Sequence, residues 1–237
     1  MKKIILLLVM FCQAVALLAQ DMPLDEFVKF FRRRANETTY AMLDGVLQHR
    51  RKGEELVSMP IYCGLIIGPE RTNGQLILND HDACLFGQSY RNGGETIIVQ
   101  NGSLEAMNNV GVQVTDLSLG FLFYPVTGEL EKTRLSMYVD CRVIVFQPEN
   151  SQTRIVAYIS EAYGFPIKAE WYDQGAETPY RTLECSDFAK DGDLYYVKRI
   201  QSSGPGWRTR IDFEKAEVGI FDKSNPVNIV RKVKQGE

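Results

Sequence analysis

The sequence contains very few of the residues and motifs on which most enzymes depend. It has only two histidines, His49 and His81. It lacks the Gly-x-Ser-x-Gly elbow of serine hydrolases, the His-Glu-x-x-His motif of zinc proteases, the phosphate loop and the Gly-x-Gly-x-x-Gly dinucleotide signature. Carboxylates are plentiful, but nothing in the sequence brings a particular pair together in a pocket. We therefore predict a protein that binds a ligand and is not an enzyme.

Metal-binding residues are equally scarce. The nearest approach to a metal site is Asp80-His81-Asp82, with Cys84 two residues further on. Successive side chains of an extended chain face opposite sides, so the two aspartates would point away from the histidine. We interpret this segment as a turn between strands and predict no metal and no other cofactor.

The chain also lacks a strong excess of charge, internal repeats and any long linker. Its net charge is -3 and its pI is about 5.6, which gives no support for a nucleic-acid partner. Hydrophobic residues make up 45% of the sequence, which is sufficient for a packed core. We predict that residues 20–237 form a single domain.

The first 19 residues have the organisation of a cleaved signal peptide. Lys2 and Lys3 precede an apolar run that ends in small residues, so cleavage is predicted after Ala19. The apolar run is too short to span a membrane comfortably. Cys12 follows the bulky Phe11, where a lipidation motif needs a small residue, so lipidation is not expected. The bacterial proportions of the segment predict export to the periplasm.

The mature chain begins with an amphipathic helix predicted over residues 23–34. Leu24, Phe27, Val28 and Phe31 recur at helical spacing. The arginines at the end of this helix are interpreted as a solvated terminus that complements the helix dipole, although they would also suit anionic head groups.

From residue 40 onwards the hydrophobic period changes to two, which is typical of strands. Strands are predicted over residues 40–48, 56–67, 75–78, 83–87 and 95–100, and a helical turn over residues 104–109. Asn73-Gly74 is the strongest hairpin signal, because both central residues of such a turn need positive φ. We therefore predict a tight turn there.

The most apolar stretch after the signal peptide covers residues 115–125. Thr115 or Asp116 would cap a short helix there, and Gly120 and Pro125 would limit its length. Two interpretations remain open. The stretch is either a lid or plug over the apolar face of a sheet, or an ordinary core segment.

Residues 135–213 read as a run of strands with one apolar face, joined by short turns, and therefore as an antiparallel meander. Such a sheet needs something to cover its apolar face. The residues predicted to share that face are Val139, Cys141, Val143 and Val145; Ile155, Ala157 and Ile159; Ile167, Ala169 and Trp171; Leu183 and Cys185; and Trp207, Thr209, Ile211 and Phe213.

The same strand pattern predicts which cysteines of the mature chain lie close enough to form a disulfide. If Asn73-Gly74 forms a two-residue turn, Cys63 and Cys84 face each other closely enough for a disulfide. Cys141 and Cys185 would lie three strands apart, which is about 14 Å at normal strand spacing. We predict that those two are buried free thiols.

The order of these parts resembles the LolA-like family of outer-membrane lipoprotein-sorting proteins, and within it the spirochaete-type LolA-like domain. The residues that carry the resemblance are DLSLGFL at 116–122, DCRVIVFQP at 140–148 and PIKAEWYD at 166–173. The resemblance implies a mainly β (α+β) fold, an unclosed and strongly curved antiparallel β-barrel with helices on its concave side.

The family's carriers hold acyl chains against that concave side and ferry lipoproteins across the periplasm. The resemblance therefore implies that the partners are lipoprotein acyl chains or lipid, together with an inner- or outer-membrane protein. Our first hypothesis is a non-catalytic carrier; the alternatives are an envelope-stress regulator with the same fold and, more weakly, a hydrolase with an unrecognised site. The residues expected to line or border the apolar cavity are Phe27, Phe31, Leu119, Phe121, Val143 and Ala157.

Overall fold

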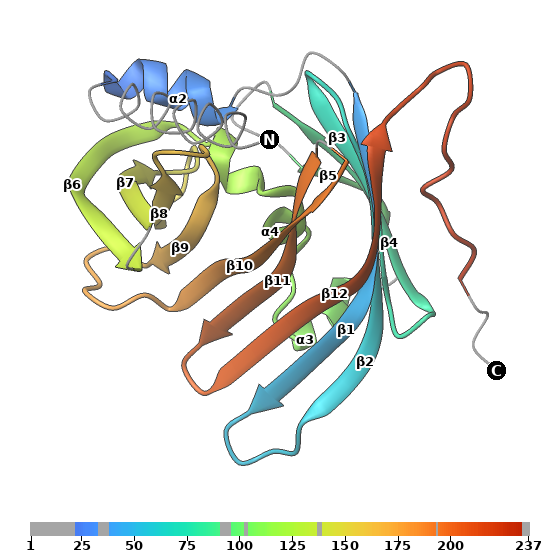
Figure 1. The fold of residues 1–237 in the computed structure, drawn as a ribbon. Coiled ribbons are helices and arrows are strands. Elements are labelled where there is room, and N and C mark those ends of the chain that lie inside the picture. The colour runs from blue at the N-terminus through green and yellow to red at the C-terminus, as the bar shows by residue number, and fades with distance from the viewer. Residues whose placement is uncertain are drawn as a thin grey trace, which may run out of the picture.

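The computed structural model describes residues 22–32, 38–90, 96–101, 104–136, 139–192 and 194–233. These residues form one antiparallel sheet of 12 strands that curls into an unclosed barrel (Figure 1). The predicted fold class is confirmed. The strand order is β5-β4-β3-β2-β1-β12-β11-β10-β9-β8-β7-β6, with β1 (Thr39–Arg51), β2 (Val57–Ile67), β3 (Arg71–Leu78), β4 (Asp82–Ser89), β5 (Thr96–Asn101), β6 (Val126–Ser136), β7 (Val139–Phe146), β8 (Arg154–Ser160), β9 (Pro166–Tyr172), β10 (Arg181–Asp191), β11 (Leu194–Gly204) and β12 (Trp207–Ile220).

The strand order explains why helices lie inside the curvature of the sheet. β5 and β6 are consecutive in the sequence but form opposite edges of the sheet, so the chain between them has to cross from one edge to the other. It crosses on the concave side and carries α3 (Leu104–Asn109), α4 (Val114–Ser118) and the 3-10 helix η1 (Gly120–Phe123) (Figure 1). The crossing segment therefore supplies part of the cover that the apolar face needs.

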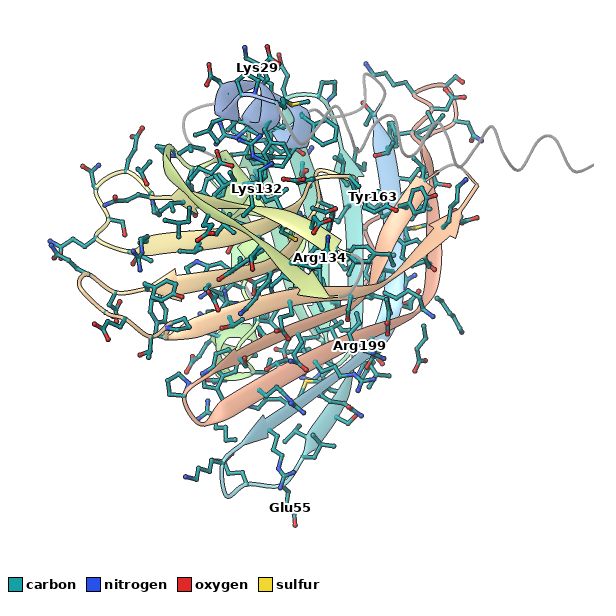
Figure 2. All side chains as sticks on the ribbon, turned by 60° about the vertical axis from the view of Figure 1, so that its left-hand side comes forward. Lys29, Glu55, Lys132, Arg134, Tyr163 and Arg199 are labelled. Carbon is teal, nitrogen blue, oxygen red and sulfur yellow. The ribbon has the colours of Figure 1, made fainter. Side chains whose placement is uncertain are left out.

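Helix α2 (Leu24–Arg32) covers the strongly curled end of the sheet formed by β6 to β9 (Figure 1). Phe27 and Phe31 are buried, and the Phe31 ring packs edge-on against Phe146 at 6.1 Å between centroids. Lys29 points away from the sheet on the outer side of the helix (Figure 2). The described part of the predicted helix thus buries the apolar stripe identified in the sequence.

The predicted inner face of β7 is wrong. Ile144 and Phe146 belong to the core cluster, whereas Val143 is buried outside it. Because residues on both faces of this strand are apolar, alternation does not distinguish them. The charge of Arg142 had indicated the outer face, but Arg142 is only 4% exposed. It donates to Glu129 and to the Met22 carbonyl oxygen and stacks 4.4 Å from the Phe27 ring centroid.

The predicted turn at Asn73-Gly74 is also wrong, because both residues lie inside β3. A side chain at Gly74 would meet the Phe86 ring at 2.5 Å and Leu65 at 2.8 Å, so this glycine permits close packing between strands. The turn instead precedes Arg71, whose carbonyl oxygen accepts a bond from Gly68 N–H at 2.9 Å.

This register separates the two cysteines that a turn at Asn73-Gly74 would have paired. Leu76 of β3 faces Cys63 on one side and Cys84 on the other, so a whole strand lies between them. All four described cysteines are buried and free, which confirms the prediction for Cys141 and Cys185 and excludes the Cys63–Cys84 disulfide in this structure.

Most other predicted elements are present. The inner faces of β8, β10 and β12 are those predicted, and so is that of β9 except at Ile167, which lies outside the core cluster beside a bulge in the pairing with β8. Helix α3 has the predicted bounds. Asn79 and Asp80 have positive φ, as expected for a turn before β4. Strand β6 was not predicted, because its charged residues alternate poorly with apolar ones. The proposed signal peptide lies outside the described residues.

Candidate functional site

Residues 114–124, comprising α4 and η1, form a plug on the concave side of the sheet. The helix predicted in this stretch is broken at Leu119, which has φ of 53°, a left-handed conformation that is uncommon for a leucine. After this break Phe121, Leu122 and Phe123 are all buried. The chain therefore turns sharply inside the barrel and directs consecutive apolar side chains into it.

Aromatic contacts hold the second half of the plug. Phe121 packs edge-on against Trp171 at 5.5 Å and against Phe146 at 6.4 Å between ring centroids. Phe123 stacks on Tyr90 at 4.3 Å. These rings come from β9, β7 and the end of β4, so the plug contacts both halves of the sheet.

Two arginines fasten the plug by polar contacts. Arg181 at the start of β10 pairs with Asp116, and both side chains are almost fully buried. Asp116 Oδ2 also accepts a bond from the Gln113 N–H at 3.0 Å, which satisfies one free donor at the start of α4. Arg32 of α2 donates to the carbonyl oxygens of Leu122 and Tyr124, each at 2.7 Å.

Several buried polar atoms around the plug have no protein partner. They are both amide atoms of Gln88, Oδ1 of Asp116 and Nη1 of Arg181. Each such group costs about 1–3 kcal/mol when it is left unsatisfied. The plug is thus held by several strong contacts, but its interface is less well satisfied than the hydrogen-bonded sheet around it.

A mainly apolar cavity of about 200 Å³ lies between the plug and the sheet. Its walls come from β1, β2, β3, β10, β11 and β12, and the plug forms one side. The lining residues are Thr39, Tyr40, Ala41, Leu43, Cys63, Leu65, Ile67, Thr72, Asp116, Leu117, Ser118, Leu119, Phe165, Cys185, Leu194, Tyr195, Tyr196, Val197, Ile200, Phe213 and Val218.

Of the six residues predicted for the cavity, Leu119 lines it. Phe27, Phe31, Phe121 and Ala157 lie in the packed core instead, and Val143 lies on the other face of β7. Most of the wall comes from β1, β2 and β11, which the prediction did not assign to the site. The alternating apolar residues of β1 and β2 are visible in the sequence, but their position opposite the plug depends on the pairing of β1 with β12.

The described cavity offers little to chemistry. Burial raises the pKa of the Cys63 thiol to about 12. The pKa of the Cys185 thiol is also raised to about 12, mainly by burial and to a smaller extent by the nearby carboxylates of Asp116 and Glu184. Neither thiol is therefore a thiolate at neutral pH. Within the described ranges, no three His, Cys, Asp or Glu residues are placed to hold a metal ion. The lining consists of apolar side chains, hydroxyl groups, two neutral thiols and the Asp116 carboxylate, which pairs with Arg181.

Solved structures with the same chain path identify the fold. A crystal structure from Vibrio parahaemolyticus, named as an outer membrane lipoprotein-sorting protein domain, matches with a TM-score of 0.58 and 14% identity over 81% of this chain and 91% of that one. The chain has a LolA-like fold. A LolA superfamily protein from Nitrosomonas europaea shares this LolA-like fold, with a TM-score of 0.55 and 11% identity over 88% and 99% of the two chains.

A DUF1329 family protein from Desulfovibrio piger also matches, with a TM-score of 0.50 and 15% identity over 86% of this chain and 91% of that chain. No protein-family model and no curated protein matches the sequence. Among the described helices of this LolA-like chain, none has both the length and the apolar character needed to cross a bilayer.

Proposed function

We propose that this protein is an exported, non-catalytic carrier that holds the acyl chains of a lipoprotein or lipid. The observation that carries the proposal is the mainly apolar cavity between the concave face of the sheet and the plug. Long apolar walls with few fixed polar groups suit chain-like ligands better than sugars or nucleotides. The LolA-like fold and the name of the Vibrio domain support the same ligand class.

Loading requires the plug to move. The cavity of about 200 Å³ is smaller than the roughly 300–1,000 Å³ of most small-molecule sites. Each CH₂ group transferred from water into the cavity contributes about 0.8 kcal/mol. An acyl chain of ordinary length therefore supplies enough free energy to displace the aromatic and polar contacts that fasten the plug.

Carriage without turnover follows from the residues that line the cavity. Its thiols are protonated, and its one carboxylate, that of Asp116, is paired with Arg181. No lining histidine is available as a general base. We therefore expect bound acyl esters and thioesters to leave the protein chemically unchanged.

Binding of a fluorescent fatty-acyl probe to delipidated protein tests the proposal, with Ala41→Phe as the blocking variant. Ala41 lines the cavity and is buried, so a phenylalanine there fills the space without adding a charge. The wild type should bind the probe, and the variant should bind it at least about tenfold more weakly. Met42→Phe is the matched control, because Met42 lies next along β1 on the opposite face.

The same preparation distinguishes the alternatives. Release of free fatty acid from an ester probe would indicate the hydrolase. A wild-type protein that binds no probe, but recovers one particular membrane protein from envelope extract, would indicate the regulator. Mass spectrometry of lipid that co-purifies under mild conditions would then identify the cargo of a carrier.

A further inference from the structure

A second, polar pocket lies on the concave side, where β1 ends, β12 begins and α3 crosses (Figure 1). Its volume is about 420 Å³, which is within the usual range for small-molecule sites. The residues that line it are His49, Arg51, Asn108, Asn109, Gly111, Gln113, Tyr180, Arg181 and Trp207. None of them belongs to the lining of the apolar cavity.

The lining of the polar pocket is electropositive and rich in hydrogen-bond donors. It contains two guanidinium groups, three side-chain amides, a phenol and an indole, and no carboxylate. One guanidinium nitrogen of Arg51 donates a hydrogen bond to the Asn109 carbonyl oxygen at 2.9 Å. Arg181 is 5% exposed, and its Nη1 has no protein partner. An unsatisfied buried guanidinium nitrogen is best satisfied by an anionic oxygen.

His49 presents a second unsatisfied atom. Its Nδ1 lies 2.8 Å from Thr209 Oγ1, and the Thr209 hydroxyl donates to the Val110 carbonyl oxygen. The hydroxyl therefore accepts from Nδ1–H, and Nε2 is left buried without a partner. Burial and then the charge of Arg51 lower the pKa of His49, against the opposing charge of Glu54, and a bound anion would oppose that shift by stabilising the protonated ring.

The Asp116–Arg181 pair connects the two pockets. Asp116 lines the apolar cavity, whereas Arg181 lines the polar pocket. An oxyanion that accepts from the free Nη1 of Arg181 brings a second negative charge beside the Asp116 carboxylate, which pairs with Nη2 and fastens the plug. Occupation of the polar pocket therefore weakens one of the contacts that close the apolar cavity.

We propose that the polar pocket binds the phosphate or carboxylate head group of an anionic amphiphile, with Arg51 and Arg181 as donors, and that this contact loosens the plug for the acyl chain. The inference rests on the proposed carrier function and specifies that the carried ligand has an anionic head group.

Two probes with the same acyl chain test the inference: lysophosphatidate, which has an anionic head group, and monoacylglycerol, which has a neutral one. Titrations of delipidated protein are made below the concentrations at which the probes form micelles. The wild type should bind lysophosphatidate at least about tenfold more tightly, because charge-assisted hydrogen bonds are about twice as strong as neutral ones. Lysophosphatidate should also shift the indole N–H signal of Trp207 in the NMR spectrum.

Arg51→Gln should reduce the preference for lysophosphatidate to about twofold or less, while monoacylglycerol binding stays unchanged. Arg50→Gln is the matched control, because it removes the same charge from the preceding residue of β1, which is exposed on the opposite face. This variant should keep the preference. An equal loss in both variants would show a general effect of net charge and overturn the site.

The remaining outcomes separate the two proposals. Equal affinity of the wild type for both probes overturns the head-group site and leaves the carrier function standing. Failure of both probes to bind overturns the carrier function itself. Inorganic phosphate is the third arm: if it binds as tightly as lysophosphatidate and shifts the same Trp207 signal, the pocket takes a free oxyanion and the head-group assignment is wrong.

Discussion

Asp116 and Arg181 form an ion pair whose side chains are only 4% and 6% exposed. Arg181 lies 4.8 Å from the Trp171 ring centroid, so its charge is enclosed by an aromatic face, the plug and the sheet. The desolvation of two charges offsets much of their attraction, and such a pair contributes little net stability compared with apolar residues. Its importance is positional, because removal of one partner leaves the other buried and uncompensated.

We predict that Asp116→Asn lowers the free energy of unfolding by about 3 kcal/mol or more, because it leaves the Arg181 charge buried without a counter-ion. Urea denaturation at neutral pH measures the change. Asp140→Asn is the control, since Asp140 pairs with Arg134 at 2.6 Å on the exposed surface, and it should have little effect. A similar small effect of both substitutions would show that the buried pair does not fasten the plug.

Glu170 is the buried carboxylate of a second polar cluster, on the outer face of β8 and β9. Its Oε2 accepts bonds from the hydroxyls of Tyr158 and Tyr172, each at 2.9 Å, and Lys168 lies 2.6 Å from Oε1. Burial alone would raise the pKa of Glu170, but these donors outweigh it and hold the pKa below the ordinary value of 4.5. Burial and the carboxylate raise the pKa of Tyr172 to about 12, so its hydroxyl remains a donor.

We predict that this cluster stabilises the fold only above acidic pH. Because the folded carboxyl has the lower pKa, its contribution is fully present above the unfolded value of 4.5 and is lost as pH falls through the folded pKa. Glu170→Gln should therefore destabilise the protein at pH 7. Between about pH 5 and pH 3 the variant should lose less stability than the wild type. Thermal unfolding across this range tests it, and an unchanged pH dependence would contradict it.

At the scale of whole elements, the C-terminal segment 222–233 acts as a strap on the outer face of β1 to β3. Ile229 is 4% exposed, and its carbonyl oxygen accepts a bond from the Tyr62 hydroxyl at 2.7 Å. Gln75 bonds both the N–H and the carbonyl oxygen of Arg231, whose guanidinium stacks on Tyr62 at 3.6 Å and pairs with Asp44. The C-terminal segment, which has no regular secondary structure, is thus held on the sheet by the contacts of Ile229 and Arg231.

We predict that Tyr62→Phe loosens this strap while the sheet stays intact. The loss of one buried hydrogen bond should cost about 1 kcal/mol and leave the Ile229 carbonyl oxygen without its partner. Hydrogen exchange should become faster at residues 229–231 and stay unchanged in β2. Tyr40→Phe is the matched control, because the Tyr40 hydroxyl bonds Glu217 on the exposed surface. Equal exchange in both variants would show that Tyr62 does not hold the strap.

At the scale of the molecule, the unclosed sheet and the crossing segment together form the apolar cavity on which the proposed carrier function rests. A closed barrel would need β5 and β6 to pair, and the chain between them would then have no reason to cross the interior. Because they are opposite edges, the crossing segment becomes a cover that rests on the sheet through side chains, without joining its hydrogen-bonded ladder. Such a cover is able to move while the sheet keeps its hydrogen bonds.

We predict that the protein is exported and that its mature form begins at Gln20. When the full chain is produced in a bacterium with its own leader, the periplasmic fraction should contain a protein whose N-terminal sequence starts there. A lipid on Cys12, or a protein retained in the membrane with residues 1–19 attached, would contradict this. Replacement of Ala19 by a bulky residue should block cleavage and serves as the internal control.

Much of the architecture is encoded locally. The period-two pattern places most strands within a few residues, with β3 and β6 as exceptions, and at β8, β10, β12 and most of β9 it identifies the inner face, because polar residues occupy the other side. The helical stripe of α2 is likewise readable, because Phe27 and Phe31 are spaced by one turn. These features depend on residues close together in the chain, which share one backbone conformation.

The site depends on contacts between distant residues, and only the folded chain decides these. β7 has apolar residues on both faces, so burial of Arg142 against Phe27 and Glu129 determines which face turns inward. Gly74 serves the packing of Phe86 and Leu65, a role that a local turn rule cannot reveal. The pairing of β1 with β12 brings Ala41, Leu43 and Leu65 to the same cavity as Phe213 and the plug, because antiparallel register joins residues that no sequence period connects.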